Sequence, residues 1–181
     1  MHAKDNPRAP RRIEQQTRTQ TCLDNFVTLE DTIHHLNELT ETCKDGELGY
    51  DTAAENVRNT QLKSVFRDYA KERAHFAQAL QAEVERLGGK PAVSGTLGAT
   101  MFRGWIHLKS ALSGGDGGAI VTACESGEEV ALGAFEIVMN TDITGPARLL
   151  VERQHRQIKE AHAHMLRLKA ESVDSTFQKT T

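Results

Sequence analysis

Two short motifs with the same pattern place a carboxylate within the apolar stripe of an expected helix. The first is Cys43–Glu47 (CKDGE), and the second, 81 residues later, is Cys124–Glu128 (CESGE). A buried carboxylate without a partner is costly, so we expect both glutamates to be paired, protonated or bound to a metal. The two segments align without gaps from each cysteine to an Asn-Thr pair, which indicates an internal duplication.

Two Glu-x-x-His motifs supply further candidate metal ligands. They are ERAH at residues 72–75 and ERQH at residues 152–155. The i, i+3 spacing puts both side chains of a motif on one helix face. Di-iron and di-manganese sites in helical bundles take one Glu from each of two helices and a Glu-x-x-His motif from each of the other two. The first hypothesis is therefore an iron or manganese site whose candidate ligands are Glu47, Glu72, His75, Glu128, Glu152, His155 and His162.

The helical phase around the first Glu-x-x-His motif favours a second hypothesis. Arg73 and Phe76 lie near the centre of the apolar stripe, whereas Glu72 lies about 70° and His75 about 130° from it. In this hypothesis the Arg73 guanidinium occupies the place of the metal and neutralises both core glutamates, Glu47 and Glu128. The sequence leaves the two hypotheses open.

Periodicity predicts an all-α fold, since strand-like alternation is nowhere sustained. Two cysteines, Cys43 and Cys124, fall on apolar faces, where we expect them to behave as small hydrophobic residues. Short turns join the helices in pairs, and a long connection joins the pairs, which is the connectivity of ferritin-like four-helix bundles. The expected helices are 28–57, 62–87, 119–140 and 147–170, with a short additional amphipathic helix at 100–112.

Composition predicts one globular domain with short tails. Residues 1–22 are expected to be a disordered basic tail, residues 23–172 the bundle, and residues 173–181 a flexible tail. We expect no membrane span and no secretory signal. A net charge of −3 indicates no nucleic-acid partner beyond a weak contact of the basic tail. Three cysteines without motif spacing favour a cytoplasmic location.

Several segments together resemble a known group of proteins. They are KDGELGYDTAAENV, FRDYAKERAHFAQALQAEVERLGG, RGWIHLKSAL and IKEAHAHM. Over roughly residues 23–170 the chain resembles a bacterial family of ferritin-like four-helix-bundle proteins of largely unassigned function, and more distantly the rubrerythrin-type bundles. The resemblance implies a ferritin-like fold and metal-assisted oxygen or peroxide chemistry in a stress or oxidative-defence role. The alternative is a metal-free interaction protein that forms a homodimer.

Overall fold

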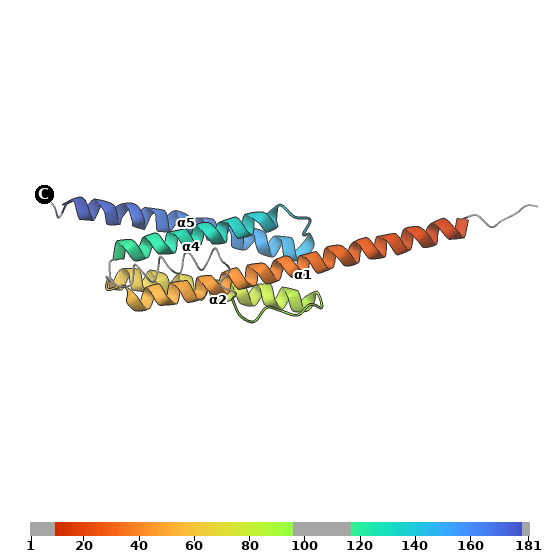
Figure 1. Ribbon diagram of the computed structural model, residues 1–181, viewed down its shortest axis with the longest axis horizontal. Coiled ribbons are helices and arrows are strands. Elements are labelled where there is room, and N and C mark those ends of the chain that lie inside the picture. The colour runs from red at the N-terminus through yellow and green to blue at the C-terminus, as the bar shows by residue number, and fades with distance from the viewer. Residues whose placement is uncertain (1–9, 96–116, 179–181) are drawn as a thin grey trace, which may run out of the picture.

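The computed structural model describes residues 10–95 and 117–178, with side chains described for residues 29–95 and 117–172. Every regular element in these ranges is an α-helix, and Figure 1 shows the helices lying side by side as a bundle. The prediction of an all-α bundle is therefore confirmed. The helices are α1 (Pro10–Asn56), α2 (Thr60–Arg86), α4 (Gly117–Met139) and α5 (Gly145–Gln178).

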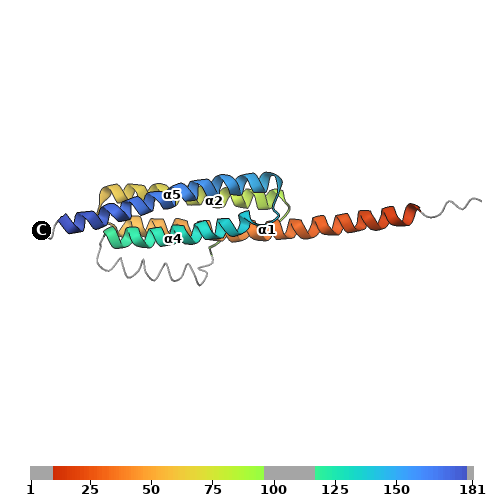
Figure 2. The same cartoon turned by 90° about the horizontal axis from the view of Figure 1, so that it is seen from above.

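Two of the four helices are longer than predicted. Helix α1 begins at Pro10 rather than near Thr28, so residues 10–22 are helical where we predicted a disordered tail. Its N-terminal part extends beyond the other helices (Figures 1 and 2). Helix α5 continues to Gln178, into the predicted flexible tail. Both extensions lack internal glycine and proline, and a proline is favourable in the first turn of a helix. The predicted short helix at 100–112 lies outside the described residues.

The ends of α2 follow from local sequence. The Asn59 side chain accepts hydrogen bonds from the backbone N–H groups of Gln61 (2.8 Å) and Leu62 (3.1 Å), which caps the N-terminus. At the C-terminus, Gly88 has a φ of 81° and donates its N–H to the Glu85 carbonyl, while Gly89 donates to Val84. This Schellman arrangement requires a residue at ease with positive φ, which glycine provides.

The helices surround a core that is divided along its length. Helix α1 packs against α2 and α4, and α5 packs against α4 and α2, so α2 and α4 lie across one diagonal of the bundle. One apolar cluster contains Leu36, Val84, Val138 and Ala147. The other contains Val57, Phe66, Ile120 and Met165. The order in which the two clusters occur along each helix shows that α1 and α5 run in one direction, and that α2 and α4 run in the opposite direction.

The segment after α2 folds back along α1. Asn37 accepts a hydrogen bond from the Ala92 N–H (2.7 Å) and donates one to the Lys90 carbonyl (3.1 Å). Further along, Gly95 lies directly against the Asp45 side chain, with no room for a Cβ at residue 95. This segment therefore buries one side of α1, including Asp45. None of the helices in the described part of the chain combines the length and apolarity needed to cross a bilayer.

Candidate functional site: a polar layer at the centre of the bundle

A polar layer separates the two apolar clusters. On α2 the clusters end at Ala70 and resume at Phe76, and on α4 they end at Cys124 and resume at Ala131. Arg73 fills the first gap and Glu128 the second, with only 1% and 2% of these side chains exposed. The two charges face each other across the diagonal of the bundle. Helical periodicity thus brings one cation and one anion to the same core level.

The Arg73–Glu128 pair is held by short hydrogen bonds. Nη2 of Arg73 lies 2.7 Å from both carboxylate oxygens of Glu128, and the Tyr50 hydroxyl donates to Glu128 Oε1 at 2.8 Å. Burial alone would lower the pKa of Arg73, but Glu128 and Tyr50 outweigh it, so this pKa is raised. Burial, together with the Glu128 charge, raises the pKa of Tyr50 well above its ordinary value. The network is therefore a fixed charge pair with a neutral phenol donor.

A glycine on α1 makes room for the Arg73 side chain. A Cβ at Gly46 would lie 3.3 Å from Cγ and 3.4 Å from Cδ of Arg73. The arginine stem therefore crosses α1 at Gly46, and the guanidinium then packs 5.2 Å from the Phe76 ring centroid. Gly127, the glycine of the second motif, differs: no described atom lies within 4 Å of a Cβ built there.

This difference predicts opposite responses to alanine at the two glycines. Gly127→Ala should raise the free energy of unfolding by up to about 1 kcal/mol, because alanine is the better helix former. Gly46→Ala should give less than this gain or a net loss, because the new methyl group presses on the Arg73 stem. Urea unfolding of both variants checks the difference. Equal gains at the two positions would contradict the close approach at Gly46.

The first-hairpin candidates lie at different depths. Arg73 and Phe76 are buried, as the apolar stripe predicts, while His75 is exposed. Glu72 is half-buried, and its Oε1 lies 3.7 Å from Arg73 Nη1. Glu47 is also only half-buried and makes no ion pair among the described residues, so the predicted Arg73–Glu47 pairing is wrong. The arginine stem instead passes over the preceding residue, Gly46, and its guanidinium is bound by Glu128.

Among the α5 residues whose side chains are described, the buried polar residue is Gln154, which was not among the predicted site residues. Gln154 is 1% exposed and donates from Nε2 to the Phe76 carbonyl at 3.2 Å. The two predicted histidines follow it on the same helix, with His155 Nε2 lying 3.9 Å from Glu136 and His162 Nε2 lying 3.6 Å from Glu125.

The remaining α5 candidate and the cysteines are engaged elsewhere. Glu152 accepts a hydrogen bond from Arg148 Nε at 2.8 Å. Burial raises the pKa of Cys43 to about 12 and also raises that of Cys124. Both thiols therefore stay protonated at neutral pH, as expected of small buried hydrophobic residues.

The candidate ligands are not arranged as a di-metal centre. Among the residues whose side chains are described, no three His, Cys, Asp or Glu residues gather closely enough to hold a metal ion. Glu128 is bound on both oxygens by a guanidinium, and Glu47 lies outside that contact. Glu128 is thus neutralised by a guanidinium instead of being free to bind a metal ion. Metal binding stays a prediction, and this arrangement does not fit it.

Aromatic rings lead from the polar layer toward the surface between α2 and α5. Tyr50 stacks on Tyr69 with ring centroids 5.3 Å apart, and the Tyr69 hydroxyl lies 2.8 Å from His164 Nδ1. Burial raises the pKa of Tyr69. Tyr50, which donates to Glu128, thus connects the ion pair to Tyr69 and His164.

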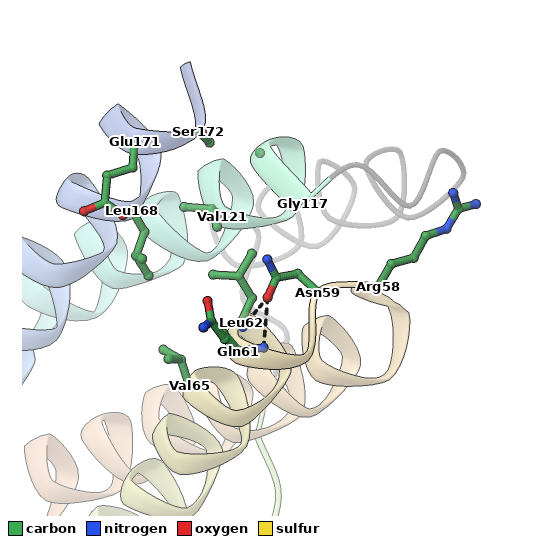
Figure 3. Close-up of a pocket in the computed structure, with 11 residues that line it drawn as sticks. Arg58, Asn59, Gln61, Leu62, Val65, Gly117, Val121, Leu168, Glu171 and Ser172 are labelled. Atoms are coloured by element: carbon green, nitrogen blue, oxygen red, sulfur yellow. Dashed lines mark hydrogen bonds between the residues drawn. The ribbon is translucent and has the colours of Figure 1, made fainter. Parts of the chain in front are cut away.

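A separate cleft of about 610 Å³ opens at the end of the bundle, near the α1–α2 turn. Its apolar lining is Leu62, Val65, Val121 and Leu168. In Figure 3 the Arg58 side chain points away from this lining, and Asn59 is engaged in the cap of α2. None of the candidate site residues lines the cleft. The polar layer, rather than this cleft, is therefore the candidate site.

Comparison with known families finds a match that covers more than half of the chain. A family described as a domain of unknown function (DUF2383) matches residues 31–141, which span α1 from Asp31 through the start of the α4–α5 turn. The chain belongs to this family. The DUF2383 match includes Arg73, Glu128 and Tyr50, so the whole network lies within the family's domain. Comparison with curated proteins finds no match.

Proposed function

We propose that this DUF2383 protein is a non-catalytic helical bundle whose central ion pair fixes the register of its two hairpins. The observation that carries the proposal is the contact of Arg73 Nη2 with both oxygens of Glu128, at 2.7 Å. The contact joins α2 of one hairpin to α4 of the other. A sliding or rotated hairpin would leave two buried charges unpaired, which penalises every alternative register.

The finer assignment to the ferritin-like superfamily is part of the same proposal. It is supported by the directions of the helices, because α2 and α4 run parallel and each hairpin is antiparallel. This is the arrangement of bundles with one long crossover connection. It is also supported by the position of Glu128, a carboxylate at the core centre.

The bundle would act through association, and we expect a homodimer. Ile137 on α4 and Leu149 on α5 are both 68% exposed, and each lies within a few turns of the α4–α5 turn. Burying apolar side chains of this size is the usual driving force of association. Their replacement by serine should shift the sedimentation of the protein toward the monomer.

Metal analysis of protein purified without chelator tests the non-catalytic assignment. We expect iron and manganese well below one equivalent per chain, and no rise in Tm when Mn²⁺ is added. Glu47→Ala and Glu128→Ala serve as the paired controls. Stoichiometric iron or manganese that is lost in both variants would overturn the proposal and favour the di-metal enzyme.

The second candidate function is metal binding at the α4–α5 interface. It is favoured by the Nε2 atoms of His155 and His162, which are buried without a hydrogen-bond partner among the described residues. Each lies near one glutamate of α4, which gives two separate His–Glu pairs rather than a cluster of three ligands. Imidazole with carboxylate suits iron, manganese or zinc, and the further ligands of an ion at either pair would have to come from solvent. Oxygen or peroxide chemistry would belong to this candidate. Metal that is retained in Glu47→Ala but lost in His162→Ala would identify it.

A further inference from the structure

The two hairpins bury equivalent positions at a constant spacing of 81 residues. In α1 with the residue that follows it, and in α4, the pairs buried in both are Leu39/Ile120, Thr40/Val121, Cys43/Cys124, Tyr50/Ala131, Ala54/Phe135 and Val57/Val138. In α2 and α5 they are Phe66/Ala147, Ala70/Val151, Arg73/Gln154, Ala77/Ile158, Leu80/Ala161 and Val84/Met165. The duplication indicated by the cysteine motifs thus extends to the second helix of each hairpin, where the sequences themselves show little likeness.

This spacing relates the residues of the polar layer in pairs. Glu47 corresponds to Glu128, and Gly46 corresponds to Gly127. Arg73 corresponds to Gln154, which is buried to the same degree. Two copies of one hairpin that pack around a two-fold axis place equivalent residues at equivalent sites. The contact between Arg73 and Glu128 therefore has a counterpart position, between Gln154 and Glu47.

The counterpart position holds smaller side chains, and no cation pairs with Glu47 among the residues whose side chains are described. The stem of Arg73 fills the space at Gly46, whereas no described atom lies within 4 Å of a Cβ at Gly127. Tyr50, which donates to Glu128, corresponds to the small residue Ala131. Gln154 Oε1 is buried without a hydrogen-bond partner among the described residues. This half of the layer thus has an unused acceptor, a half-exposed carboxylate and open space beside a glycine.

We infer that the polar layer is a two-fold site with one half filled by Arg73, and that the other half, formed by Glu47 and Gln154 beside Gly127, accepts a guanidinium group. The filled half identifies the chemistry, because a guanidinium already binds the equivalent carboxylate there. A planar, fork-shaped donor suits a carboxylate with an amide oxygen better than a spherical cation does. The half-exposed position of Glu47 gives a small ligand a route from solvent.

Gln154→Arg tests the inference with a guanidinium supplied by the chain itself. We expect Tm to rise by about 3–6 °C, because the new side chain would reach Glu47 as Arg73 reaches Glu128. The rise should disappear when Glu47→Gln is added, whereas the exposed control Glu55→Gln should leave it intact. A fall in Tm, or a rise that is unchanged by Glu47→Gln, would overturn the second half-site.

Methylguanidinium chloride provides a second test that requires no change in the core. It should raise the Tm of the wild-type protein relative to sodium chloride of the same ionic strength, but not that of Glu47→Gln. Equal shifts in the two proteins would count against the site. The inference rests on the Arg73–Glu128 pair of the proposed function. Substitution of Arg73 and Glu128 tests the proposed function separately. Coupling between Arg73 and Glu128, with none between Glu47 and residue 154, would therefore overturn only the second half-site.

Discussion

Arg73→Met should lower the free energy of unfolding by about 3–5 kcal/mol. Methionine keeps an unbranched apolar stem of similar length but removes the guanidinium, so Glu128 would be left buried with the Tyr50 hydroxyl as its remaining donor among the described residues. The same loss is expected for Glu128→Leu, which leaves Arg73 without its carboxylate. Urea unfolding followed by circular dichroism measures both effects. Arg67→Met, on the exposed face of the same helix, should change stability by less than about 0.5 kcal/mol.

The double variant Arg73→Met/Glu128→Leu separates an ion pair from ordinary packing. Its loss of unfolding free energy should be smaller than the sum of the two single losses by about 2 kcal/mol or more, because both charges are removed and none is left buried without a partner. Adding Tyr50→Phe should recover further stability, since the Tyr50 hydroxyl would otherwise lose its acceptor. Strictly additive losses would show that Arg73 and Glu128 do not interact, and would remove the basis of the proposed function.

Asp45→Asn should stabilise the protein at about pH 7.5, by about 1–3 kcal/mol, and leave it nearly unchanged at about pH 4. The segment after α2 covers Asp45, and this burial, together with the charge of Glu41, raises the pKa of the carboxyl from 3.8 to about 6. Between about pH 4 and pH 6, Asp45 keeps its proton in the folded protein, whereas the same carboxyl in the unfolded chain has released it. The contribution of Asp45 to the free energy of unfolding therefore falls as pH rises from about 4 to above 6.

Asparagine is neutral at every pH, so the variant should lose this fall in stability. Asp51→Asn is the matched control, because Asp51 lies on the same helix and is exposed. Its pH profile should follow that of the wild-type protein. An Asp45→Asn profile that runs parallel to the wild-type profile between about pH 4 and pH 7.5 would show that Asp45 is not held in its neutral form.

Local signals determined the elements of this protein to a large extent. The Asn59 cap and the Gly88-Gly89 stop act within one or two helical turns, so α2 was predicted to within two residues at each end. The burial of Arg73 and Phe76 also followed from sequence, because a helix of one phase has one apolar stripe. The same argument placed His75 outside the core.

Long-range contacts decided what the periodicity left open. Asp45 lies off the apolar stripe of α1 and is buried only because the segment after α2 packs over it. Glu125 is buried between α4 and α5, where Lys169 donates to it at 2.7 Å. The residue pattern of one helix does not show which side chains another segment will pack against it. The role of Gln154 in the polar layer was not predicted, because an uncharged Gln within a helix is not marked as a candidate site residue by charge or motif.

Glu47 and Glu128 show most clearly which properties the sequence determines and which depend on tertiary packing. The repeated Cys-x-x-Gly-Glu motif determined that Glu47 and Glu128 occupy equivalent positions in two copies of a hairpin. Only the packing of the hairpins decided that they have different surroundings. Arg73 crosses α1 at Gly46 and reaches Glu128, whereas the equivalent residue Gln154 is too short to do the same for Glu47. A helix sequence fixes which face is buried, but which charge meets which depends on side-chain reach across the core.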